Sequence, residues 1–77
     1  MLIWAPTRKS LDGRGTSLGT TRKVEIEQLS DGIFLLMRYE SVEAPFPTSD
    51  HCYASLEEAY DECERVYGVD REDWVQR

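Results

Sequence analysis

The sequence of 77 residues contains no asparagine, one histidine and only two cysteines, and no apolar run is longer than five residues, the length of Ile33–Met37. A membrane-spanning helix needs about 20 mostly apolar residues, so none is expected. Without asparagine there is no acceptor for N-glycosylation. In the first ten residues the apolar side chains precede the charged ones, which is the reverse of a secretory signal. We therefore expect a cytoplasmic protein without a membrane segment.

The shortage of histidine and cysteine also bears on chemistry. A structural zinc site needs four ligands, and here only His51, Cys52 and Cys63 could act as soft ligands. His51 and Cys52 are neighbours and would point to opposite faces of a strand, whereas Cys63 falls on the apolar side of a predicted helix. The many nearby carboxylates disfavour the thiolate that nucleophilic catalysis requires. We expect no catalytic residue, no metal and no cofactor.

Nucleotide binding finds equally little support. The glycine-rich stretch at residues 13–19 resembles a phosphate-binding loop, but it lacks the Gly-Lys-Ser/Thr ending, and no helix is expected directly after it. No small-molecule ligand is therefore evident from the sequence.

The length predicts one small domain spanning residues 1–77. A chain of this size buries only about 60% of its unfolded surface. Small domains therefore often depend on disulfides, a structural metal or oligomerisation. Because cysteines stay reduced in the cytoplasm and metal ligands are too few, self-association as a homodimer is the leading expectation.

A β-hairpin is the clearest local structure. Asp31-Gly32 is typical of a two-residue type I′ turn, because both central residues of that turn need positive φ. The flanking segments 22–29 and 33–40 are rich in β-formers and are predicted to be its two strands.

A turn at Asp31-Gly32 also predicts the register of the hairpin. It places Val24 opposite Tyr39 and Ile26 opposite Met37 on one face. On the other face it forms two pairs of opposite charge, Lys23 with Glu40 and Glu25 with Arg38. The same register leaves three apolar side chains on the charged side. Together with Trp4 they form the candidate interface, which consists of Leu29, Phe34, Leu36 and Trp4.

The remaining elements are one helix and one or two short strands. Ser55 is a good N-cap, with Glu58 three residues later as in a capping box. Apolar residues recur at helical spacing over residues 56–67, and Gly68 stands where a helix C-terminus is expected. A short strand is expected near 51–54, and residues 2–4 could add another.

The fold class is therefore α+β. The antiparallel sheet has three to four strands, and one C-terminal helix packs on one face.

The charges are divided unevenly along the chain. Residues 1–23 hold five basic side chains and one acidic residue, whereas residues 24–77 hold four arginines and fourteen acidic residues. Within the first part, residues 5–21 are predicted to be a mobile arm or loop, because glycine, serine and threonine dominate there. The candidate basic arm consists of Arg8, Lys9, Arg14, Arg22 and Lys23. It could contact nucleic acid, although the acidic remainder opposes this and could instead attract the arm within the same chain.

The outer face of the predicted helix is acidic. Such a face is most often solvated, but it could capture a basic protein partner through electrostatic steering. The candidate residues are Glu57, Glu58, Asp61 and Glu62.

The segment Tyr53-Ala54-Ser55-Leu56-Glu57-Glu58-Ala59, followed by Gly68-Val69 and Trp74, resembles the ending of many short bacterial α+β proteins. Most of these are uncharacterised, and some are similar to toxin-immunity proteins. The resemblance covers residues 51–74 and carries over no functional residue.

The sequence thus favours a small, non-enzymatic bacterial protein that acts by protein–protein binding and self-associates. An immunity-like or inhibitor protein that captures a basic partner is the first alternative. Nucleic-acid association through the basic arm is the second.

Overall fold

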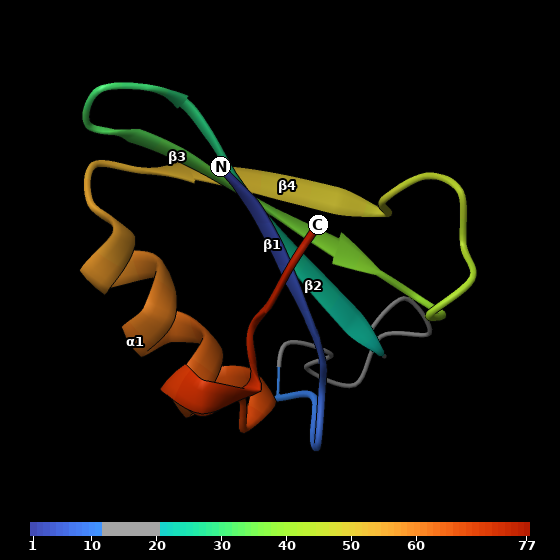
Figure 1. Cartoon of the computed structure of the whole chain (residues 1–77). Helices are drawn as coiled ribbons and strands as arrows, with labels where there is room; N and C mark the ends of the chain where they lie inside the picture. Colours follow the sequence, from blue (N-terminus) through green and yellow to red (C-terminus); the bar gives the residue numbers. More distant parts are fainter. Residues whose placement is uncertain (12–20) are drawn as a thin grey trace.

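The computed structural model describes residues 1–11 and 21–77 as one five-stranded antiparallel sheet with a helix against one face (Figure 1). The strands are ordered β4-β3-β2-β1-β5. In sequence order the elements are β1 (Leu2–Pro6), β2 (Lys23–Ser30), β3 (Ile33–Tyr39), β4 (Ser49–Tyr53), the helix α1 (Leu56–Tyr67), a 3₁₀ turn (Arg71–Asp73) and β5 (Val75–Gln76). The α+β class is confirmed.

Two features of the sheet differ from the sequence prediction. The sheet has five strands rather than three to four, because the two-residue strand β5 pairs with β1. The strand expected at residues 2–4 extends over Leu2–Pro6 and lies inside the sheet, between β2 and β5. A two-residue strand is too short to show an alternating pattern, so the sequence gives no signal for β5.

The predicted hairpin is present, but its register is wrong beyond the turn. Ser30 pairs with Ile33 as expected, and an irregularity between Gln28 and Ser30 then shifts every further pair by one residue. Ile26 therefore lies opposite Leu36 rather than opposite Met37. The expected charge pairs Lys23–Glu40 and Glu25–Arg38 do not form, because Lys23 lies opposite Tyr39 and Glu25 lies opposite Met37.

The bulge at Leu29 determines which side chains of β3 face α1. The shift brings Phe34 and Leu36 to the same side as Val24 and Ile26, where α1 covers them. Leu29, the residue left out of the ladder, stays exposed.

The core lies between the sheet and α1. From the sheet it contains Ile3, Ala5, Val24, Ile26 and Leu36, and from the helical segment it contains Ala59, Cys63, Val66, Tyr67 and Val69. The apolar spacing of residues 56–67 thus marks the face of the helix that packs on the sheet.

The helix ends are formed by the residues that the sequence indicates. The Ser55 hydroxyl accepts a hydrogen bond of 3.2 Å from the backbone N–H of Glu58. At the other end Gly68 has a φ of 67°, in the left-handed region that favours glycine. The backbone N–H groups of Gly68 and Val69 donate to the carbonyls of Glu64 and Cys63.

Residues 7–11 form an anchored loop. The backbone N–H groups of Arg8 and Lys9 both donate to the Tyr67 carbonyl, and that of Leu11 donates to the Val66 carbonyl. These bonds satisfy carbonyls that the last turn of a helix leaves without partners. The predicted mobile arm or loop over residues 5–21 therefore does not begin at residue 5. Residues 12–20 of that prediction lie outside the described residues.

The loop between β3 and β4 carries a solvent-facing aromatic side chain. Phe46 stands between Pro45 and Pro47 and is 77% exposed. Within the described part of the chain, no helix is long and apolar enough to cross a membrane.

Candidate functional site

The sheet has a second face, opposite the one that packs on α1. Side chains alternate along each strand, so this second face carries Leu2, Trp4, Lys23, Glu25, Glu27, Leu35, Met37, Tyr39, Asp50, Cys52 and Val75. Most of its apolar side chains are half-buried, whereas Val75 is exposed. No helix of the described residues lies over this face.

A buried cluster of charged side chains lies at one end of the second face. The Glu25 side chain is only 4% exposed and pairs with two cations, Lys23 and Arg77. Lys23 Nζ lies 3.4 Å from Glu25 Oε2, and its side chain is 7% exposed. The Tyr39 hydroxyl donates a 2.9 Å hydrogen bond to Glu25 Oε1. Buried charges persist only when paired and hydrogen-bonded, and Glu25 meets this condition.

Tyr39 reinforces the cluster in two ways. Lys23 Nζ lies over the Tyr39 ring, 4.1 Å from its centroid, in a cation–π contact. Burial of its hydroxyl, together with the hydrogen bond to Glu25, raises the pKa of Tyr39 to about 12. The phenol is therefore neutral near neutral pH and acts as a hydrogen-bond donor.

A pocket adjoins this cluster. It is lined by Trp4, Lys23, Val42 and Arg77. Two of these residues bring positive charge and two bring apolar surface. Arg77 is held in place because its backbone N–H donates to the Leu2 carbonyl. The pocket thus combines cations with an apolar wall.

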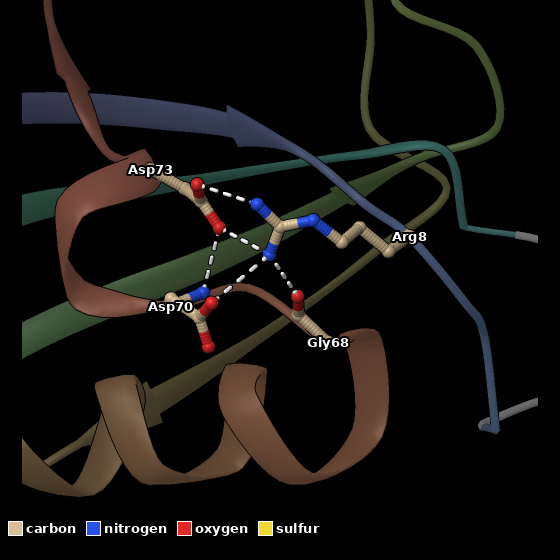
Figure 2. Close-up of polar contacts among 4 residues, drawn as sticks. All are labelled: Arg8, Gly68, Asp70 and Asp73. Atoms are coloured by element: carbon tan, nitrogen blue, oxygen red, sulfur yellow. Dashed lines mark hydrogen bonds and ion pairs between the residues drawn. The ribbon is translucent and has the colours of Figure 1, made fainter.

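Arg8, the first member of the predicted basic arm, is bound within the chain. The Arg8 guanidinium donates to the Gly68 carbonyl at 2.7 Å and to both Asp70 and Asp73, as Figure 2 shows. This contact holds the pKa of the Asp73 carboxyl below its ordinary value, mainly through the hydrogen bond from Arg8 and then through one from the Asp70 backbone. Arg8 therefore joins the loop at residues 7–11 to the segment that follows α1.

The other described members of the predicted arm differ in burial. Lys23 is buried in the second-face cluster, whereas Lys9 and Arg22 are exposed. Arg14 lies outside the described residues.

The predicted acidic partner face lies on α1 and is partly neutralised within the chain. Arg71 forms ion pairs with Glu57 and Asp61, and Arg65 forms one with Glu62. Glu58 is exposed.

The candidate interface of Leu29, Phe34, Leu36 and Trp4 is divided between the two faces of the sheet. Leu36 is fully buried in the core and Phe34 packs against it, so the expectation that they lie exposed on the charged face is wrong. The cause is the register shift at Leu29. Leu29 itself is exposed beside the turn, and Trp4 lies on the second face.

The three soft ligands do not meet. Cys63 is buried in the core, and this burial raises the pKa of its thiol to about 12. Cys52 is exposed on β4, and the His51 ring makes an edge contact with Tyr53. Among residues 1–11 and 21–77, no group of three or more His, Cys, Asp or Glu side chains is arranged to hold a metal ion.

Comparison with known proteins identifies no relative: no family model, no curated protein and no solved structure matches the chain.

The sequence does not reveal the cluster of Glu25, Lys23 and Arg77. Arg77 is far from Glu25 in the sequence and reaches it through β5, which has no sequence signal. The available signal is that Lys23 and Glu25 alternate with the core residues Val24 and Ile26 along β2. Charged residues at alternate positions of a central strand must either face water or be paired.

Proposed function

We propose that this protein acts by binding other protein chains rather than by catalysis, and that it associates with itself through the second face of the sheet. The observation that carries the proposal is a sheet with one helix-covered face and one face on which Trp4, Leu35 and Met37 are only half-buried. Antiparallel sheets that face water on one side usually carry polar residues there. Covering such apolar side chains with a second copy adds about 25 cal/mol per Å² of buried apolar surface.

The test of self-association is sedimentation over a range of concentrations. We expect a reversible dimer in the micromolar range, with a melting temperature that rises with concentration. Val75→Lys, which places a charge on the exposed part of the second face, should shift the protein toward monomer. Leu11→Lys is the matched control, because Leu11 is exposed at the C-terminal end of α1 and should leave association unchanged. A monomer of constant melting temperature, or equal effects of the two variants, would contradict the proposal.

Capture of a basic partner by the acidic face of α1 has weaker support. Three of its four carboxylates already form ion pairs with Arg65 or Arg71. Charge reversal of Glu58, Asp61 and Glu62 would test it, because capture should then weaken and lose its salt dependence.

Nucleic-acid association through the basic arm is also weakly supported. Arg8 is bound to Asp70 and Asp73, and Lys23 is bound to Glu25. Both cations are therefore engaged by carboxylates that phosphate groups would have to displace.

A further inference from the structure

We propose that the pocket lined by Trp4, Lys23, Val42 and Arg77 is a binding site for a carboxylate group with a short apolar body. The pocket shares Trp4 with the self-association surface proposed above, but the binding proposed here goes beyond self-association, because a monomeric chain could bind such a group.

The charge count of the cluster supports an anion. Lys23 and Arg77 share one carboxylate, that of Glu25, which is the one acidic partner of either cation within the described residues. Two cations that line the pocket therefore contact a single carboxylate. Arg77 is half-exposed and Lys23 also lines the pocket, so a second carboxylate that enters would lie beside both cations and accept charge-assisted hydrogen bonds.

The hydrogen-bond donors support the same conclusion. An ammonium group has three N–H donors and a guanidinium has five. Glu25 Oε2 is the acceptor next to both Lys23 and Arg77, and the remaining contact of the Lys23 ammonium is with the Tyr39 ring. Lys23 is nearly buried but lines the pocket, and the guanidinium of Arg77 is half-exposed beside it. The site therefore has donors that a ligand oxygen can use.

The walls and the size of the pocket restrict the ligand. Trp4 and Val42 offer an apolar surface beside the cations. The pocket volume of about 160 Å³ is below the roughly 300–1,000 Å³ of sites that bind drug-sized ligands. A cofactor or nucleotide is too large for it, whereas an acidic side chain of a partner protein or a small free organic acid fits. Both sources present the same carboxylate.

The test is a titration of the ¹⁵N-labelled protein with benzoate, followed by NMR at the Trp4 indole N–H and the Arg77 side chain. Benzamide, which is neutral and has nearly the same shape, is the ligand control. We expect saturable shifts with benzoate and none with benzamide at concentrations up to about 10 mM, which is tenfold above a 1 mM dissociation constant. Equal shifts with both compounds, or none with either, would overturn the proposal unless the peptide described next binds.

A second titration distinguishes the source of the carboxylate. It uses acetyl-Leu-Glu-Leu-amide and its glutamine counterpart as probes. Tighter binding of the glutamate peptide than of benzoate supports a partner side chain, whereas binding of benzoate alone supports a small acid. If neither carboxylate binds better than its neutral counterpart, the pocket is not a carboxylate site.

Variants of the chain complete the test. Arg77→Gln removes a half-exposed cation and should weaken binding about tenfold. Lys23→Met should abolish binding, provided that its circular dichroism shows a folded protein. Arg22→Gln removes an exposed neighbouring charge that does not line the pocket and is the matched control. Equal binding by Arg77→Gln and Arg22→Gln would count against the site even if Lys23→Met does not fold.

Discussion

At the scale of single residues, the buried contacts of Tyr39 and Cys63 govern how the protein responds to alkaline solution. Burial raises the pKa of each to about 12, and for Tyr39 the hydrogen bond to Glu25 adds to this. In the unfolded chain a tyrosine titrates near pH 10 and a cysteine near 8.5. Between those values and pH 12 the unfolded state therefore holds fewer protons than the folded state, and the free energy of unfolding decreases as pH rises.

The variant Tyr39→Phe tests the contribution of the hydroxyl. At pH 7 we expect the free energy of unfolding to fall by about 1.5–3 kcal/mol, because a hydrogen bond to a charged carboxylate is lost. The difference in stability between the wild type and Tyr39→Phe should shrink as the pH approaches 12, because the wild-type hydroxyl then loses its proton and can no longer donate to Glu25. Urea denaturation at pH 7 and near pH 11 measures both effects.

Tyr60→Phe is the control for this prediction, because the Tyr60 ring is half-buried and its described contacts are with Trp74 and Arg71 through the ring. A loss of stability at pH 7 as large as that of Tyr39→Phe would show that removing any tyrosine hydroxyl has this effect. The Tyr39 contact with Glu25 would then not be the cause.

At the scale of elements, the sequence is most informative where a structure is determined locally. Ser55, Gly68 and the apolar spacing between them predict α1 at its observed bounds, because helix caps and helical periodicity depend on neighbouring residues. The turn at Asp31-Gly32 is found in the same way.

The register of the β2–β3 hairpin and the second-face cluster cannot be predicted from neighbouring residues alone. The bulge at Leu29 places Phe34 and Leu36 against α1, which is far away in the sequence. Arg77 reaches Glu25 because β5 pairs with β1. Both outcomes depend on tertiary contacts, and tertiary packing commonly overrides local pairing preferences.

Deleting Leu29 tests the bulge. Without this residue, a two-residue turn at Asp31-Gly32 leads directly into the observed pairs, so the core face of the hairpin is unchanged. We expect a folded protein whose free energy of unfolding changes by no more than about 1 kcal/mol, the value of one ladder hydrogen bond. Far-UV circular dichroism and thermal melting provide the measurement.

Deletion of Leu35 is the matched control, since it moves every later residue of β3 to the opposite face. It should prevent folding, because Leu36 would leave the core. If deleting Leu29 reduces the stability of the fold as much as deleting Leu35 does, the bulge at Leu29 does not determine the register.

At the scale of the whole molecule, Arg8 links segments that are far apart in the sequence. It joins the loop after β1 to Gly68, Asp70 and Asp73, beyond the end of α1. The same loop donates backbone hydrogen bonds to the last turn of α1. The N-terminal segment thus belongs to the folded body and fixes the position of the helix end.

This linkage makes stability sensitive to acid. The pKa of the Asp73 carboxyl is held below its ordinary value by the Arg8 guanidinium. Its contribution is therefore complete above the unfolded pKa of about 3.9 and is lost as pH falls through the folded pKa. We expect Arg8→Gln to lower the melting temperature at pH 7 and to reduce the difference between pH 7 and pH 3. Arg22→Gln, at an exposed position directly before β2, should have neither effect.

The pairing of β1 with β5 also has a consequence for synthesis on the ribosome. β1 is made first, and it lies between β2 and β5 in the finished sheet. One edge of β1 can pair as soon as residues 23–30 emerge, but the other must wait for Val75 and Gln76. Throughout translation of the intervening segment, that edge has unsatisfied backbone groups of the kind that recruit other strands. The nascent chain is therefore most vulnerable to misassembly between the completion of its hairpin and the arrival of its last strand.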